Sequence, residues 1–486
     1  MTDFDTIHSA TDFDTTHSAP RVWQDAASPP SMPKPTVLLI ASAYFMVTLD
    51  ALVVVTALPS IHRQFGGSLA TLQWTVSAYN TTYAAGILTA AALGDRLGRR
   101  RVFLTGLVLF ALASAACALA PNTAALIAFR TLQGFGAAAI MPTGLTLLTS
   151  AFPSDKRGTV VGIWGGVAGL GVAAGPLVGG AVTQGLSWHW IFWVNVPVAA
   201  LAIIGARVRL AESFGPRTPL DLPGLAVVTL GVGVLVWALV DGPQDGWTST
   251  KVLLALAAAA VLLASFVARQ ARAAAPMIPL GLFRTGRFSL AVLAQFATSA
   301  SIFSAAFLTS EYFQFGRGDS PLATGLRFLP WTATPLIVAP IAGALFDKLG
   351  ARRLVVPGLL MQAGGFVWIV HLAGTHAGYG AFVAPFLIAG VGISMTLPCI
   401  PASGLNSVAP AWLGTGSGVL TMTQLLGATV GVAMTTIVFD ANGSLLGAAA
   451  VTEGYRPALG LAAAFSTAGA LLGLGLRRAR QAPALQ

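Results

Sequence analysis

Apolar segments of about twenty residues dominate the chain, and each is separated from the next by a short polar stretch. An α-helix needs about 20 such residues to cross the hydrocarbon core of a bilayer. Residues are 55% hydrophobic and 9% charged, against ~25% charged in a typical soluble protein. We therefore expect an all-α integral membrane protein that crosses the bilayer many times.

Fourteen of these segments have the length of a transmembrane helix. Gly and Pro occur inside several of them, which membrane helices tolerate. The predicted spans are residues 36–58, 72–93, 102–120, 124–149, 159–181, 190–209, 222–240, 252–269, 288–310, 322–345, 354–373, 379–402, 415–438 and 457–476.

The positions of the basic residues predict the orientation of the chain. If both ends are cytoplasmic, most of the 27 Lys and Arg residues fall in the ends and in the loops on that side. Cytoplasmic loops of membrane proteins carry such an excess. It accounts for the net charge of +10 without a nucleic-acid partner. This distribution predicts that both ends are cytoplasmic. The composition, which is rich in Ala, Gly and Arg, favours a bacterial source, so we expect a bacterial inner-membrane protein.

The first 35 residues differ from the rest of the chain. TDFDTIHSA (2–10) is repeated almost unchanged as TDFDTTHSA (11–19), and a Pro/Ser-rich stretch follows. So polar a segment buries too little apolar surface to fold alone. We expect residues 1–35 to form a disordered cytoplasmic tail and residues 477–486 to form a second, shorter tail.

An internal repeat divides the apolar part of the chain. AALGDRLGRRR (91–101) and GALFDKLGARR (343–353) share one pattern, and their separation equals that between the first and ninth predicted spans. QGFGAAAIMP (133–142) and AGVGISMTLP (389–398) match at a similar interval. This repeat predicts two homologous six-helix bundles, 36–209 and 288–476, with two further helices inserted in 210–287.

With these motifs the chain resembles the major facilitator superfamily, and within it the fourteen-span drug:proton antiporters of the EmrB/QacA type. The resemblance rests on LDALVVVTALPSI (49–61), QWTVSAY (73–79), GDRLGRRR (94–101), LIAFRTLQGFGAA (126–138), GVAAGPLVGG (171–180) and WHWIFWVNVP (188–197). It implies the major facilitator fold and proton-coupled efflux of lipophilic, cationic or aromatic compounds by alternating access. A dedicated exporter of one metabolite or self-made antibiotic is the alternative, and a membrane sensor is a third class.

Two ionisable residues interrupt apolar segments of the first half. Asp50 lies within the first span, where a carboxylate costs ~2.5–3.5 kcal/mol, and Arg130 follows an apolar run in the fourth. Pairing lowers the cost of burying both groups, so we expect them to be neighbours. The resemblance implies that Asp50 exchanges the coupled proton and that Arg130 tunes it. The alternative is an ion pair that only fixes helix register.

The two repeated loops are candidate conformational latches. Asp95 could cap the N-terminus of a neighbouring helix, and Gly98 permits a tight turn. By resemblance these loops stabilise one facing state, whereas the alternative is that their positive charge only sets topology. The residues concerned are Asp95, Arg96, Gly98, Arg99, Arg100, Asp347, Lys348, Gly350, Arg352 and Arg353.

The segment GVAAGPLVGG predicts close helix packing. Gly171, Gly175 and Gly179 are spaced four apart, so they lie on one helix face, and Pro176 adds a kink. By resemblance this stretch, including Gly180, is the antiporter motif that favours export. Tight packing without an effect on direction is the alternative.

Four further residues are also candidates from the sequence. Glu311 could recognise a cationic drug or only lie at the membrane interface, and Arg327 could pair with it across a short loop. Asp440 is expected in a solvated loop after the thirteenth span. His189 could respond to external pH, or it lies among the interfacial tryptophans Trp188, Trp190 and Trp193.

Several function classes lack their sequence signature. There is no GxxxxGK[ST] loop for ATP, and no HExxH motif or nucleophile elbow for hydrolysis. Both cysteines lie in apolar runs, so we expect no metal site, no disulfide and no cofactor. We therefore predict a transporter rather than an enzyme, a functional monomer whose partners are a small-molecule substrate, protons and membrane lipid.

Overall fold

The computed structural model describes residues 34–150, 157–214, 221–273, 276, 278, 280–284, 286–373, 377–408 and 413–476. Within these ranges the regular structure is entirely helical. The helices in chain order are α1 (Lys34–Phe65), α2 (Leu69–Leu97), α3 (Arg99–Ala118), α4 (Thr123–Ser150), α5 (Arg157–Gly185), α6 (Trp190–Trp193), α7 (Asn195–Arg209), α8 (Leu222–Asp245), α9 (Thr250–Arg272), α10 (Gly286–Glu311), α11 (Pro321–Thr332), α12 (Thr334–Leu349), α13 (Ala351–Ala373), α14 (Gly380–Thr396), α15 (Cys399–Leu405), α16 (Leu413–Asn442) and α17 (Ala448–Gly473). The predicted tails lie outside the described residues, except for positions 34 and 35.

The helices have the length and composition of membrane spans. In the described part of the chain, 11 helices are long and apolar enough to cross a bilayer. A lipid environment favours helices because every backbone polar group is then paired within its own segment. The protein is therefore a multi-pass membrane protein. The predicted count of fourteen is not reached by this criterion, since α2, α5 and α17 are not among the 11.

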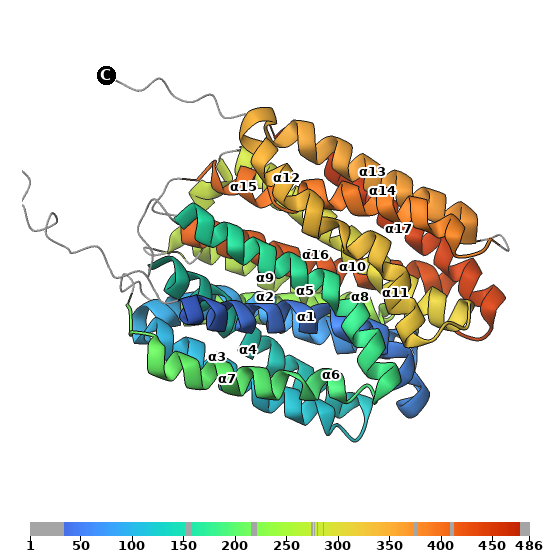
Figure 1. Ribbon diagram of the computed structural model, residues 1–486, viewed down its shortest axis with the longest axis horizontal. Helices are drawn as coiled ribbons and strands as arrows, with labels where there is room; N and C mark the ends of the chain where they lie inside the picture. The colour runs from blue at the N-terminus through green and yellow to red at the C-terminus, as the bar shows by residue number, and fades with distance from the viewer. Residues whose placement is uncertain are drawn as a thin grey trace, which may run out of the picture.

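One packing pattern occurs twice along the bundle (Figure 1). In the first set of helices α1 packs on α5, and α3 packs on α4 and α7; in the second, α10 packs on α16, and α13 packs on α14 and α17. We call α1–α7 the N-terminal set and α10–α17 the C-terminal set. The end of the bundle at which α1 begins is called proximal, and the end at which α1 finishes is called distal.

The two sets meet along two main seams. One seam lies between α2 and α16, and the other lies between α5 and α11. Side chains at the distal end add to the contact between α1 and α10, because Ser310 Oγ donates to Val55 O at 3.1 Å and Gln314 Nε2 donates to Thr56 O at 3.0 Å. The sets are therefore joined at the distal end in this state.

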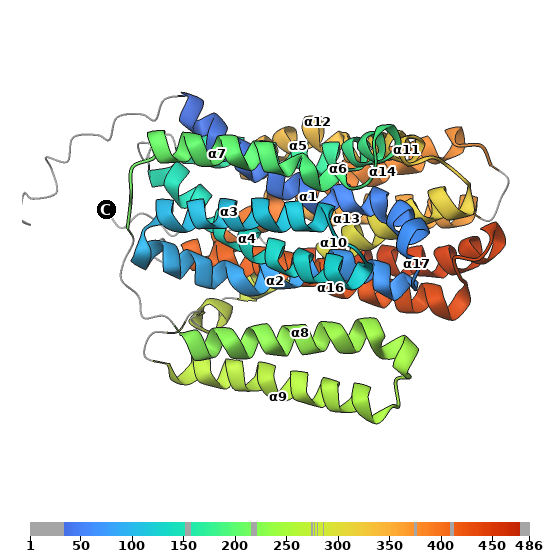
Figure 2. The ribbon, with the colours of Figure 1, turned by 90° about the horizontal axis from the view of Figure 1, so that it is seen from below.

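Helices α8 and α9 form a hairpin along one side of the bundle (Figure 2). The hairpin packs against α2 and α16 through α8. Asp221 closes its base, since its carboxylate accepts from Gly224 N at 2.9 Å, Arg269 Nε at 2.6 Å and Gln270 Nε2 at 2.8 Å. Burial alone would raise the pKa of Asp221, but these hydrogen bonds lower it below its ordinary value.

Three of the predicted spans are broken in the structure: segment 190–209 forms α6 and α7 with a break at Val194, and the other two are divided near prolines. Segment 322–345 forms α11 and α12 with a break at Ala333, between Pro330 and Pro335. Segment 379–402 forms α14 and then α15, with Pro398 at the break. Proline removes a backbone donor and clashes with the preceding turn, so these positions interrupt the helix.

Candidate functional site

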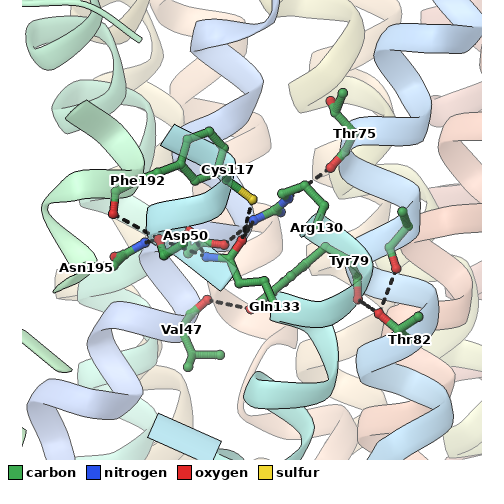
Figure 3. Close-up of polar contacts among 12 residues, drawn as sticks. Val47, Asp50, Thr75, Tyr79, Thr82, Cys117, Arg130, Gln133, Phe192 and Asn195 are labelled. Carbon is green, nitrogen blue, oxygen red and sulfur yellow. Dashed lines mark hydrogen bonds and ion pairs between the residues drawn. The ribbon is translucent and has the colours of Figure 1, made fainter. Parts of the chain in front are cut away.

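Asp50 is fully buried in the N-terminal set, among α1, α3, α4 and α7 (Figure 3). Arg130 Nη1 donates to Asp50 Oδ2 in a short ion pair. The other oxygen, Oδ1, accepts from Gln133 Nε2 at 2.9 Å and from Asn195 Nδ2 at 2.8 Å. Three donors thus offset the cost of removing this carboxylate from water.

Arg130 connects the carboxylate on α1 to the backbone of α2. Its Nε donates to Thr75 O at 3.0 Å, and its Nη1 also donates to Gln133 Oε1 at 2.7 Å. The guanidinium lies over the Tyr79 ring, 4.1 Å from the centroid, where the ring face attracts a cation. A change at Asp50 therefore acts on α2 and α4 as well as on α1.

A second layer of polar groups positions the two amides. Ser114 Oγ accepts from Asn195 Nδ2 at 3.0 Å and from Gln133 Nε2 at 3.3 Å, and it donates to Phe192 O at 2.9 Å. Gln133 and Asn195 were not predicted as site residues, although both lie in motifs that carried the resemblance. Gln133 follows Arg130 by three residues, so the two share a helix face, and this spacing could have revealed it.

The glycine row on α5 packs directly against α1, the helix that carries Asp50. A Cβ atom on Gly171 would lie 2.3 Å from Thr48 Oγ1, and one on Gly179 would lie 2.5 Å from Val53 O. A Cβ atom on Gly175, which lies between them, would be 2.8 Å from Leu52 Cβ. The row thus allows a backbone approach that any side chain would prevent.

The other face of the same segment contacts the C-terminal set. A Cβ atom on Gly180 would lie 2.3 Å from Pro321 O, and one on Gly325 of α11 would lie 2.5 Å from Pro176 O. The segment GVAAGPLVGG is therefore enclosed between α1 on one side and α11 on the other.

The first repeated loop reverses the chain at Gly98, whose φ of 112° suits glycine. Asp95 accepts from Arg99 Nε at 2.8 Å, so its partner lies one turn away in sequence. We had expected Asp95 to cap a neighbouring helix. Among the residues that the structure describes, its side-chain bond is instead to Arg99, while Arg96 is exposed.

Glu212, which the sequence analysis did not identify, caps α3. Its Oε1 accepts from Arg100 N at 2.9 Å, and the adjacent Ser213 O accepts from Arg99 N at 2.9 Å. Arg100 Nη2 in turn donates to Arg207 O at 2.7 Å. The loop GDRLGRRR is thus bound to the segment that follows α7 within the same set.

The second repeated loop has the same backbone turn. Gly350 ends α12 with a φ of 79°. Lys348, Arg352 and Arg353 are exposed. Asp347 lies on α12, and its side chain is outside what the structure describes.

Glu311 and Arg327 are not paired, contrary to our expectation. Arg327 Nη1 forms its ion pair with Asp319, and its guanidinium lies 5.2 Å from the Tyr379 ring centroid. Glu311 ends α10 and is 1% exposed, and neither of its carboxylate oxygens has a hydrogen-bond partner in the described part of the chain. The pairing was wrong because Asp319, in the loop between them, is nearer to Arg327.

Two other expectations also need correction. Asp440 is exposed, but it lies in the last turn of α16 rather than in a loop. Trp188 is buried and donates from Nε1 to Gln64 Oε1 at 2.7 Å, so it joins the α5–α6 turn to α1 rather than facing outward. His189 stacks on Trp188 with ring centroids 3.8 Å apart, and burial lowers its pKa. Trp190 is exposed.

Within the described ranges, no group of three or more His, Cys, Asp or Glu residues could hold a metal ion. Cys117 and Cys399 are both buried free thiols. Cys117 belongs to the Asp50 network, since its Sγ donates to Gln133 Oε1 at 3.8 Å.

Comparisons with known proteins agree with this architecture. The sequence profile of the Major Facilitator Superfamily matches residues 40–432, and the chain belongs to that family. A crystal structure of the peptide transporter POT in complex with sulfate has the same fold, with a TM-score of 0.66 over 91% of this chain and 94% of that chain at 17% identity.

Curated relatives carry names connected with resistance and export. The multidrug resistance protein Stp of Mycobacterium tuberculosis is 36% identical over 82% of this chain and 74% of that protein. The tetracenomycin C resistance and export protein of Streptomyces glaucescens is 34% identical over 83% of this chain and 75% of that protein. A probable actinorhodin transporter of Streptomyces coelicolor is 34% identical over 90% of this chain and 78% of that protein. These relationships support a role in efflux transport of small molecules.

Proposed function

We propose that this protein is a proton-coupled exporter of lipophilic, cationic or aromatic compounds, of the fourteen-span EmrB/QacA type. The buried Asp50 carboxylate carries the proposal, because an ionisable group is costly to place inside a membrane and usually marks a functional site. The names of the relatives, which include a multidrug resistance protein and antibiotic export proteins, support the substrate class.

Protonation of Asp50 is the proposed coupling step. A proton on this carboxyl removes the negative charge that neutralises Arg130, so the pair loses most of its attraction. Arg130 keeps its bonds to Thr75 O and Gln133 Oε1, which belong to α2 and α4. The contact between α1 and these helices then weakens, and the equilibrium between two arrangements of the helices shifts.

The glycine segment of α5 gives this change a route to the other half. Gly171 and Gly179 hold α5 against α1, while Pro176 and Gly180 hold it against α11. A displacement of α1 relative to α4 therefore moves the α5–α11 seam. Transporters of this architecture expose a central site alternately by motion of one repeat against the other.

The remaining sequence assignments belong to this proposal. The protein works as a monomer in a bacterial inner membrane, with both chain ends and the proximal end of the bundle in the cytoplasm. Residues 36–209 and 288–476 act as the two moving bundles, and 210–287 is inserted between them. The loops at Gly98 and Gly350 act as latches, and Glu311 is a further candidate for substrate or proton binding.

The test is transport in inverted membrane vesicles with an imposed pH gradient. Wild type is expected to take up a lipophilic cationic dye and to dissipate the gradient, whereas Asp50→Asn should do neither while remaining folded. Glu453→Gln is the matched control, because it also replaces a carboxylate by an amide, at an exposed position of α17, and should behave as wild type. If Asp50→Asn transports as well as wild type, the proton is carried elsewhere and Glu311→Gln is the next variant.

A dedicated exporter of one compound is the second candidate. Several relatives are named for a single antibiotic, including tetracenomycin C and methylenomycin A. A substrate panel in the same vesicles separates the two possibilities. Transport of many unrelated dyes favours broad efflux, whereas transport of one chemical series favours a dedicated exporter.

A further inference from the structure

Helix α2 carries a row of uncharged polar side chains that the proposed proton site does not use. Gln73, Ser77, Asn80 and Thr81 are 0%, 0%, 1% and 6% exposed. Gln73 and Ser77 belong to QWTVSAY, the motif whose Thr75 and Tyr79 contact Arg130. We call these four residues the α2 polar row.

The polar atoms of this row lack partners. Gln73 Nε2 and Oε1, Ser77 Oγ, Asn80 Oδ1 and Thr81 Oγ1 are all buried without a hydrogen bond to any residue that the structure describes. Each such atom costs about 1–3 kcal/mol, so five in little more than two turns need an explanation. Thr82 on the same helix differs, because its hydroxyl donates to Ala78 O at 2.8 Å.

The row faces the seam between the two sets. Helix α4 lies against the opposite side of α2, where a Cβ atom on Gly134 would be 2.5 Å from Tyr79 O. At 3.6 residues per turn, the polar row is turned away from α4, toward the side of α2 on which α16 packs. On α16, Thr436 is 2% exposed and its hydroxyl also lacks a partner in the described part of the chain.

We propose that the α2 polar row binds the hydroxyl and carbonyl groups of exported molecules when the α2–α16 seam opens. The row holds both donors and acceptors, and the Gln73 amide offers one of each to the same ligand. It carries no charge, so it recognises hydrogen-bonding groups rather than a cation. Hydroxylated aromatic carbonyl compounds combine these groups with the apolar body that a lipophilic exporter takes. This inference rests on the proposed export function.

The row is linked to the proton site through one turn of α2. Arg130 Nε donates to Thr75 O, and Thr75 lies between Gln73 and Ser77 in the sequence. A molecule bound at the row and a proton at Asp50 would therefore act on the same turn. Binding of a molecule at the row and protonation of Asp50 should therefore each change the affinity of the other, in either direction.

The test compares two probes that differ in hydrogen-bonding groups. Doxorubicin carries several hydroxyl and carbonyl groups, whereas the lipophilic cation tetraphenylphosphonium has none. The variants Gln73→Met, Ser77→Ala and Asn80→Leu keep approximate volume and remove the polar atoms. Binding to the purified full chain in lipid nanodiscs and transport in inverted vesicles are both measured, with wild type required to bind and transport each probe.

We expect the Gln73→Met variant to weaken doxorubicin binding about tenfold, as the loss of two ordinary hydrogen bonds implies, with tetraphenylphosphonium changed less than about twofold. Thr435→Val is the control, because it removes a buried hydroxyl that already donates to Gly431 O at 3.0 Å, and it should leave both probes unchanged.

Two results would overturn the inference. If the variants weaken binding of both probes equally, the row has a structural role or binds only water. If the affinities and transport rates are unchanged in all three variants, the row does not bind substrate. Failure of wild type to transport either probe would instead count against the proposed export function, so the two failures are distinguishable.

Discussion

Arginine has a geometric role beside Asp50 that another cation would not fill. The Arg130 guanidinium donates from Nε to one helix and from Nη1 to two side chains, and its flat face lies on Tyr79. A planar fork with several fixed donors can satisfy these partners together, whereas an ammonium group is a single point charge. The site thus depends on shape as well as on charge.

Replacement of Arg130 by Lys tests this role. The variant keeps the positive charge but loses at least one hydrogen bond from a charged donor, each worth about 1.5–3 kcal/mol. We expect proton-coupled transport to fall roughly tenfold or more, measured as initial rates in inverted vesicles. Arg209→Lys, at an exposed position at the end of α7, is the control and should leave the rate unchanged. Wild-type rates in the Arg130 variant would show that charge alone is sufficient.

The two ionisable residues of this site could be predicted from the sequence, whereas its two amide side chains could not. Asp50 and Arg130 stand out because a charge within an apolar run is costly, so the structure brings together two residues that sequence had already singled out. Gln133 and Asn195 are neutral and cost less to bury, so their signal is weak. Glu212 was missed for a different reason, since it lies in a loop far from the motif that it caps.

At the scale of single elements, helix α5 shows how close packing depends on the absence of side chains. The atom nearest to a Cβ is a threonine hydroxyl at both Gly171 and Gly179, but at Gly179 a backbone oxygen, Val53 O, would also lie only 2.5 Å away, whereas the nearest backbone atom at Gly171 would be 3.2 Å away. A side chain can be shortened by mutation, but a backbone atom cannot. We therefore expect that a second mutation can relieve the overpacking at Gly171 but not at Gly179.

Gly171→Ala is expected to lower stability by about 1–3 kcal/mol through overpacking, measured by thermal unfolding in detergent. Adding Thr48→Ala removes the nearest atom and should restore part of the loss. Gly179→Ala should cost a similar amount without rescue from Thr48→Ala. Gly185→Ala, near the end of the same helix with no atom of the described residues within 4 Å of its Cβ position, is the control. Equal effects at all three glycines would contradict the packing argument.

Glu212→Ala tests the cap on α3. It removes the acceptor of Arg100 N and the charge near Arg101, so we expect a loss of about 0.5–2 kcal/mol and faster hydrogen exchange at residues 99–102. Asp95→Ala removes only a pair between residues four apart, worth about 0.2–0.5 kcal/mol. The exposed Glu453 on α17, changed to Ala, is the control. A larger effect at Asp95 than at Glu212 would reverse the assignment.

Hydropathy predicted the existence of most helices but not their interruptions. The segment 322–345 reads as one apolar run, yet α11 and α12 are separate because prolines on both sides of Ala333 remove backbone donors. Apolar content measures the tendency to enter a membrane, and it is insensitive to a local break in hydrogen bonding.

For the whole molecule, the distal contacts between the two sets should control transport. Leu322 N donates to Gln184 Oε1 at 3.1 Å across the α5–α11 seam. Cysteines at 184 and 322, joined by a short bifunctional thiol reagent, should hold the seam closed and abolish transport. A reagent that contains a disulfide allows the block to be reversed by reduction.

A cysteine pair at Arg317 and Ala377 is the control for this cross-link. Arg317 Nη2 donates to Ala377 O at 3.1 Å, and both residues belong to the C-terminal set. Cross-linking there should leave transport intact, and the native thiols Cys117 and Cys399 are buried. Full transport after complete cross-linking at 184 and 322 would show that this seam does not open.

The internal repeat predicts two bundles of helices, and one packing pattern does occur in both the N-terminal and the C-terminal set. The position of the α8–α9 hairpin could not be predicted in this way. It has no counterpart in the repeat, and helices that face lipid carry little pattern to indicate which neighbour they contact.

The hairpin has a consequence for how a molecule dissolved in the bilayer can reach the interior. Because α8 touches α2 and α16, it stands between that seam and the acyl chains. A compound diffusing in the lipid encounters the hairpin on this side, so lateral entry favours the opposite side, along α5 and α11. The two seams therefore differ in how accessible they are from the membrane, although the repeat makes the two halves alike.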